Sequence, residues 1–106
     1  MGLSKSRISL VVPVFNEEAS LPLFMDAFRK ESEDWPFTAD VIFVNDGSSD
    51  SSLALLRYYA EEYDDVYYLS FSRNFGKEVA LSAGMDYATG DAVVVMDVDM
   101  QRPFEA

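Results

Sequence analysis

Short apolar runs alternate with amphipathic stretches along the whole chain. The apolar runs are rich in Val, Ile and aromatic residues, which is typical of buried strands. We expect these strands over 8–14, 41–45, 66–71 and 92–96. Between them, apolar residues recur at three- and four-residue spacing, which predicts three helices. This alternation indicates an α/β fold with a mainly parallel sheet.

The third helix is expected over about 77–88 and combines two kinds of surface. One apolar face comprises Val79, Ala83 and Tyr87. The small residues Ala80 and Gly84 allow the helix to approach the sheet closely.

The run that follows, over 92–96, has the length of a buried strand and is too short to cross a bilayer. No export signal is visible, so the cytoplasm is the expected compartment.

The charge balance limits the functions that the chain can have. The 106 residues, enough for one small domain over 1–106, include 19 acids and 8 bases and carry a formal net charge of −11. We expect no nucleic-acid partner, because affinity for phosphate backbones requires clustered Lys and Arg. The chain has no His. Catalysis must therefore rest on carboxylates, and any metal should prefer oxygen ligands, as Mg²⁺ and Mn²⁺ do.

Polar clusters follow all four predicted strands. They occupy 15–18, 45–48, 72–77 and 97–102. Ligands bind at the carboxyl ends of strands in open parallel sheets, so these clusters are expected to form one site.

Asp97 and Asp99 form the sharpest motif. Two carboxylates at positions i and i+2 point the same way in an extended chain and need a cation beside them. A metal held there would bridge the oxygens of a diphosphate. The alternative is a solvated turn that ends the strand. The position after an apolar strand, on an edge with three other polar clusters, favours the metal.

Four other charged residues are candidates for the same site. Asp46 can accept hydrogen bonds from a nucleobase or ribose. Asp50 can cap the next helix, so Asp46 stays partly available for a ligand. The alternative is that Asp46 forms an Asx-turn that caps this helix. Glu17 is equally consistent with a ligand contact and with favourable charge at a helix N-terminus. Arg73 and Lys77 suggest phosphate contacts, and the alternative is a pair of surface salt bridges.

Taken together, the motifs resemble those of glycosyltransferase family 2, which has the GT-A fold. The motifs lie at 12–18, 44–50 and 97–101. The stretch 72–78 is similar to the polyprenyl-phosphate glycosyltransferases, the group of the dolichol-phosphate mannose synthases and bactoprenol glucosyltransferases. The likeness covers residues 8–103 and implies a Rossmann-like half-domain that binds a nucleotide-diphospho-sugar. By analogy with that fold, the strand order should be third, second, first, fourth.

The resemblance also implies residue roles. The nucleotide pocket would be lined by Pro13, Phe15, Glu17, Asp46 and Asp97. The metal, Mg²⁺ or Mn²⁺, would be held by Asp97, Asp99 and Gln101. Arg73 and Lys77 would lie near the phosphates or the acceptor. Two positions depart from the usual pattern: Asn45 replaces a common Asp, and Arg102 places a base beside the metal where the subgroup usually has an acid.

Family members continue well past the D-x-D motif. The acceptor site, the general base and C-terminal membrane helices are therefore expected beyond Ala106. The chain should bind a UDP- or GDP-linked sugar and the metal. A full-length protein should transfer a hexose to a polyprenyl phosphate at the cytoplasmic face of the membrane, in cell-wall or lipopolysaccharide synthesis. Exposed sheet edges predict self-association into a homo-oligomer.

Three other functions compete with this interpretation. Phosphatases of the haloacid dehalogenase type also carry D-x-D after an apolar strand, but usually after the first strand; a trapped phospho-aspartate at Asp97 would identify one. A Rossmann dehydrogenase is disfavoured, because no G-x-G-x-x-G follows any strand. A non-catalytic module that binds nucleotide or assembles with partners stays open, and a sugar-transfer assay separates it from an enzyme.

Overall fold

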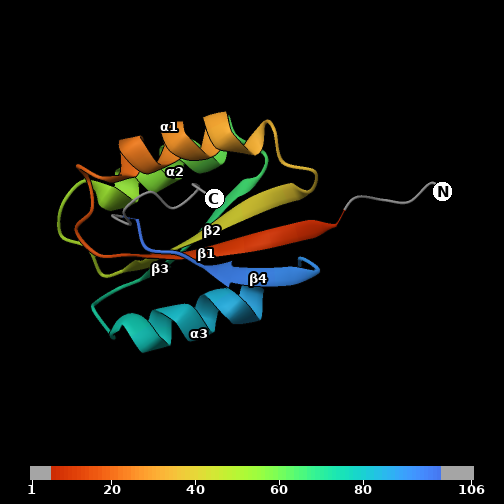
Figure 1. Cartoon of the computed structure of the whole chain (residues 1–106). Helices are drawn as coiled ribbons and strands as arrows, with labels where there is room; N and C mark the ends of the chain where they lie inside the picture. Colours follow the sequence, from red (N-terminus) through yellow and green to blue (C-terminus); the bar gives the residue numbers. More distant parts are fainter. Residues whose placement is uncertain (1–5, 99–106) are drawn as a thin grey trace.

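The computed structural model describes residues 6–98, which form a sheet between two layers of helices (Figure 1). The elements are β1 (Arg7–Val14), α1 (Leu21–Ser32), β2 (Thr38–Asp46), α2 (Ser52–Glu62), β3 (Val66–Phe71), α3 (Lys77–Tyr87) and β4 (Ala92–Val95). Helices α1 and α2 cover one face of the sheet, and α3 covers the other.

All strand pairings in the sheet are parallel, and the strand order is β3-β2-β1-β4. Both the α/β fold class and the expected order are therefore confirmed. The order reverses direction between β1 and β4, because the chain moves outward first through β2 and β3 and then returns to the other side of β1. In open α/β sheets this reversal leaves a crevice at the carboxyl ends of the two strands.

The main hydrophobic core lies between the sheet and the α1/α2 layer. Alternate residues of the two central strands face it, among them Val12 of β1 and Phe43 of β2, both fully buried. Phe24 of α1 meets Phe43 edge to face, with ring centroids 5.7 Å apart. This arrangement follows from the period of two in a strand and fixes the sheet-side position of α1.

Helix α3 packs on the sheet through small residues, as expected, but its apolar face does not become buried. Ala80 and Gly84 are buried, whereas Val79 and Tyr87 are 48% and 47% exposed. A Cβ atom on Gly84 would overlap Val11 Cγ1 and lie 3.1 Å from Val44 Cγ2. The helix is therefore too close to the sheet for a larger side chain at the contact.

Gly84→Ala is expected to destabilise the fold by roughly 1–3 kcal/mol, because Val11 and Val44 are buried β-branched residues that cannot move aside. The gain in helix propensity, about 1 kcal/mol, opposes but does not cancel this cost. Urea denaturation measures the change. Ser82→Ala on the exposed side of the same helix is the control and should leave the midpoint unchanged or slightly raised. Equal midpoints for the two variants would contradict the close packing.

Strand β4 differs from the buried strand that its sequence predicts. Val93, Val94 and Val95 are 40%, 43% and 45% exposed. Within residues 6–98, β4 pairs only with β1, so its outer edge and parts of both faces have no cover. An uncovered apolar edge favours association with another strand, which keeps the expected homo-oligomer open as a prediction. The helices within residues 6–98 lack the combination of length and apolar character that a membrane-spanning helix needs.

Candidate functional site

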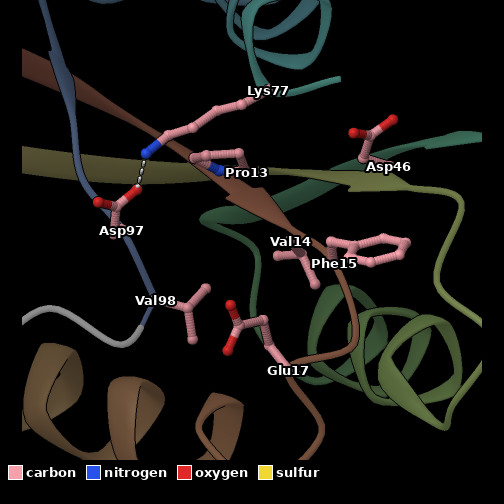
Figure 2. Close-up of a pocket in the computed structure, with 8 residues that line it drawn as sticks. All are labelled: Pro13, Val14, Phe15, Glu17, Asp46, Lys77, Asp97 and Val98. Carbon is pink, nitrogen blue, oxygen red and sulfur yellow. Dashed lines mark ion pairs between the residues drawn. The ribbon is translucent and has the colours of Figure 1, made fainter. Parts of the chain in front are cut away.

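An open hollow of about 270 Å³ lies at the carboxyl edge of the sheet, where β1 and β4 end (Figure 2). It is lined by Pro13, Val14, Phe15, Glu17, Asp46, Lys77, Asp97 and Val98. The structure therefore brings together six of the residues that the sequence singled out. They come from four separate segments, which meet because the carboxyl ends of parallel strands share one edge of the sheet.

Lys77 and Asp97 point toward one another across the hollow (Figure 2). Lys77 Nζ lies 2.8 Å from Asp97 Oδ1, and the two side chains are 58% and 49% exposed. An ion pair this exposed contributes little to stability. Its significance is chemical, because it places one ammonium in a hollow that three acidic residues line, Glu17, Asp46 and Asp97. The excess of negative charge opposes the binding of an anionic ligand, and a further cation would reduce that repulsion.

The loop after β1 is held against the loop after β2 by Asn16. Asn16 has φ of 53°, a left-handed conformation that Asn tolerates better than most residues. Its Oδ1 accepts hydrogen bonds from the backbone N–H groups of Ser49, at 2.8 Å, and Asp50, at 3.3 Å. Its own N–H donates to Ser48 Oγ at 2.9 Å. Sequence reasoning missed this role, although an Asn after a strand is a recognised turn signal.

Glu17 and Glu18 diverge. The Glu18 carboxylate accepts from the Ser51 N–H at 2.8 Å, so it caps the start of α2 and not that of its own helix. Glu17 donates its backbone N–H to Ser52 Oγ at 2.8 Å, while its carboxylate points into the hollow (Figure 2). Only Glu17 is thus placed to meet a ligand. Sequence reasoning separated these two residues in the same way.

Asp50 joins the same two loops through a carboxylate with a lowered pKa. Burial raises this pKa, but hydrogen bonds from the side chain and backbone of Ser52 and from the backbone of Glu18 lower it by more. A group with a depressed pKa stabilises the fold above its ordinary pKa. That contribution is lost as the pH falls through the lowered value.

Asn16→Ala is expected to lower the free energy of unfolding by roughly 1–3 kcal/mol, because two backbone donors lose their acceptor and a non-glycine residue keeps a positive φ. Denaturant titration measures the loss. Asn16→Gly relieves the backbone strain but not the lost hydrogen bonds, so it should recover only part of the stability. Full recovery with glycine would show that the side chain does not hold the two loops together.

Asp46 is engaged within the protein. Its Oδ1 accepts from the Phe75 N–H at 2.7 Å, and its Oδ2 accepts from the Gly76 N–H at 3.0 Å and from Asn74 Nδ2 at 3.1 Å. The residue is only 4% exposed. A loop about thirty residues later thus already uses both oxygens, so a ligand is not the only group that needs this acceptor.

Gly47 lets the loop at 72–76 reach Asp46. Gly47 has φ of +74°, and a Cβ atom there would overlap the Arg73 carbonyl carbon and the Asn74 nitrogen. The loop thus lies directly on the backbone of the turn after β2. Arg73 itself turns away to stack on Phe75, with its guanidinium carbon 4.6 Å from the ring centroid, and it does not line the hollow. Of the two predicted phosphate-binding cations, only Lys77 does so.

The sequence matches the family model described as glycosyl transferase family 2 over residues 9–106. The chain belongs to glycosyl transferase family 2. This confirms the resemblance drawn from its motifs. The motifs that carried that resemblance supply the lining of the hollow at 13–15, 17, 46, 77 and 97–98.

Among curated relatives, bactoprenol glucosyl transferases are prominent. The chain is 50% identical over 99 residues to the bactoprenol glucosyl transferase of Shigella phage SfX, covering 93% of this chain and 32% of that protein. It is 39% identical over 101 residues to the putative glycosyltransferase CsbB of Bacillus subtilis, covering 95% of this chain and 31% of that protein. The chain thus spans about a third of the length of these family members.

Solved structures agree on the GT-A architecture. The mannosyltransferase PcManGT from Pyrobaculum calidifontis, in complex with GDP-Man and Mn²⁺, has a TM-score of 0.77 and 27% identity, covering 90% of this chain and 28% of that chain. S. aureus TarS in complex with UDP-GlcNAc has a TM-score of 0.75 and 22% identity, covering 88% of this chain and 26% of that chain. At this identity the likeness supports the fold alone.

The expected metal ligands fall partly outside the described residues. Asp99, Gln101 and Arg102 lie there, and within 6–98 no three acidic side chains gather as a metal cluster. Asp97 is described, and its hard oxygen already contacts a cation, the Lys77 ammonium, at 2.8 Å. Mg²⁺ and Mn²⁺ prefer oxygen ligands, so the half-exposed carboxylate of Asp97 is suited to be one ligand of such a metal.

Proposed function

We propose that residues 1–106 form the nucleotide-sugar-binding part of a glycosyltransferase that transfers a hexose from a UDP- or GDP-linked donor. The observation that carries the proposal is the hollow at the β1/β4 reversal, which joins an exposed aromatic ring, an ammonium group and several carboxylates. A ring, a cation and carboxylates complement the base, the diphosphate and the hydroxyl groups of a nucleotide sugar.

Each lining residue has a role that its chemistry supports. Phe15, 47% exposed at the rim, offers a stacking face for the base, with Pro13 beside it. Glu17 accepts hydrogen bonds from ribose or sugar hydroxyls, and Lys77 approaches the diphosphate. Arg73 remains a second candidate for phosphate or acceptor contact, at the edge of the site. Asp46 contributes to the wall of the pocket.

The donor site also requires a divalent metal in this proposal. Asp97, Asp99 and Gln101 would hold Mg²⁺ or Mn²⁺ through oxygen atoms, as suits a chain without His or Cys. When bound, the metal supplies charge neutralisation for the leaving diphosphate. The presence of Mn²⁺ in the structure of PcManGT supports this assignment.

We further propose a polyprenyl phosphate as the acceptor in the full-length protein. Support comes from the relatives named as bactoprenol glucosyl transferases. Such a lipid places the reaction at the cytoplasmic face of a membrane, in cell-wall or lipopolysaccharide synthesis. The acceptor site and the general base would lie beyond Ala106, since the chain spans about a third of these relatives.

A donor screen tests the proposal. UDP-, GDP- and CMP-linked sugars are titrated into the chain with Mn²⁺, and polyprenyl phosphate is then added to detect transfer. We expect saturable binding of a UDP- or GDP-linked sugar. Binding without transfer identifies the chain as a non-catalytic donor-binding module when tested alone, whereas no binding of any donor rejects the proposed site.

A further inference from the structure

We propose that Ser52 is a positioning residue of the donor site, because its buried hydroxyl holds the backbone of Glu17 and so directs the Glu17 carboxylate into the hollow. This inference rests on the proposed function, since the hydroxyl groups of a bound nucleotide sugar are the partners proposed for Glu17. Ser52 itself lies outside the lining of the hollow.

The backbone of Glu17 is held at both of its polar groups. Its N–H group donates to Ser52 Oγ at 2.8 Å. Its carbonyl oxygen accepts from the N–H groups of Ser20, at 3.0 Å, and Leu21, at 2.9 Å, where α1 begins. With the backbone fixed in this way, the carboxylate moves mainly by rotation about its side-chain bonds. It points into the hollow from a defined origin (Figure 2).

Ser52 is a firm anchor because it is buried and bonded on several sides. It is the first residue of α2 and is 0% exposed. Its N–H donates to Asp50 Oδ1 at 2.8 Å, and its hydroxyl donates to the same carboxylate. The hydroxyl therefore uses its one donor on Asp50 and an acceptor site on Glu17. A ligand in the hollow does not meet this hydroxyl, so an effect of Ser52 on ligand affinity must pass through the loop that it holds.

The residues beside Glu17 are tied to the same part of the chain. Asn16 and Glu18 both form hydrogen bonds with residues 48–51. The loop after β1 is thus attached to the start of α2 over three consecutive residues. Ser52 holds Glu17 itself, whereas the other contacts hold its neighbours. Loss of the Ser52 hydroxyl should therefore release the Glu17 backbone without detaching the whole loop.

A double-mutant cycle between Ser52 and Glu17 tests the inference. UDP-glucose, GDP-mannose and inorganic pyrophosphate are each titrated with Mn²⁺ into the parent chain, Ser52→Ala, Glu17→Ala and the double variant. For the donor that binds, Ser52→Ala should weaken the affinity roughly three- to tenfold, and Glu17→Ala at least as much. The double variant should match Glu17→Ala, because a positioning residue has no effect once the group that it positions is gone. Pyrophosphate offers no hydroxyl groups to Glu17, so its affinity should be the same for Ser52→Ala and the parent.

Ser9→Ala is the matched control. Ser9 is also 0% exposed, and its Oγ accepts from the Gly90 N–H at 3.0 Å, which is the same kind of bond near the amino end of β1. This variant should leave donor affinity unchanged. If Ser52→Ala does not fold, Ser52→Cys, which fills the space with a weaker acceptor, takes its place. Additive losses in the cycle, an equal loss for pyrophosphate, or an equal loss in Ser9→Ala would overturn the inference.

Amide hydrogen exchange, read by NMR, gives a second readout that needs no ligand. Protection of the Glu17 N–H should fall roughly tenfold or more in Ser52→Ala and change much less in Ser9→Ala. Unchanged protection in folded Ser52→Ala would show that Ser52 does not hold Glu17 and would overturn the inference, whatever the affinities. Lost protection in a chain whose parent form binds neither donor would uphold the anchor and reject the proposed donor site.

Discussion

Replacing Gly47 with alanine is expected to lower the free energy of unfolding by roughly 3–5 kcal/mol and to abolish nucleotide binding. The new Cβ atom would meet backbone atoms of Arg73 and Asn74, which cannot rotate away, and the residue would still have φ of +74°. The loop at 72–76 must then leave the turn after β2 and lose its hydrogen bonds to Asp46. Chemical denaturation and nucleotide titration measure the two effects.

Gly76→Ala is the matched control for this prediction. Gly76 also has a positive φ, of +106°, but a Cβ atom there would have no neighbour within 4 Å. It should cost only the backbone strain, roughly 1–3 kcal/mol. The difference between the two variants therefore isolates the contact between Gly47 and the loop. Equal losses would mean that the loop does not depend on this close approach.

The second large effect is expected at the D-x-D motif. Divalent metal and nucleotide diphosphate should each tighten the binding of the other by the same factor, of about 5–150-fold, because the carboxylates repel the diphosphate unless a cation lies between them. Asp99→Asn should abolish this coupling, and Asp97→Asn should weaken it. We expect the base Arg102 either to compete with the metal for Asp99 or to hold a phosphate in its place. Calorimetry with Mn²⁺ and each variant measures the coupling factor.

Asp86→Asn is the control for the charge change. Asp86 is exposed on α3, and its replacement alters the net charge by the same amount as the D-x-D variants. It should leave the coupling factor intact. If Asp86→Asn reduces the coupling as much as Asp97→Asn does, the effect comes from the overall acidity of the chain and not from the motif.

The fold was predictable because its strands and turns are local features. The alternation of apolar runs with amphipathic helices gave the α/β class, and the analogy with the GT-A fold gave the order β3-β2-β1-β4. The buried face of α3 was harder to assign, because periodicity reports hydrophobicity and not the distance to the sheet. Val79 stays exposed while Gly84 makes the contact. The exposure of β4 depends on what covers it, which its own residues do not encode.

The candidate site was predictable in its membership but not in its internal contacts. Strand ends share one edge of the sheet, so Pro13, Glu17 and Asp97 had to meet. The partners of Asp46 are about thirty residues away in the sequence, and no local pattern shows that a later loop uses its oxygens. The role of Asn16 was missed for a similar reason, since its hydrogen bonds join two loops that are far apart in the sequence.

Calorimetric titration of UDP and GDP into the parent chain, first with Mn²⁺ and then with excess EDTA, tests the central claim most directly. The account predicts saturable binding of at least one nucleotide with Mn²⁺, and an affinity at least about fivefold lower with EDTA. Equal affinities in the two conditions, or no binding in either, would contradict a metal-dependent donor site in the hollow between β1 and β4.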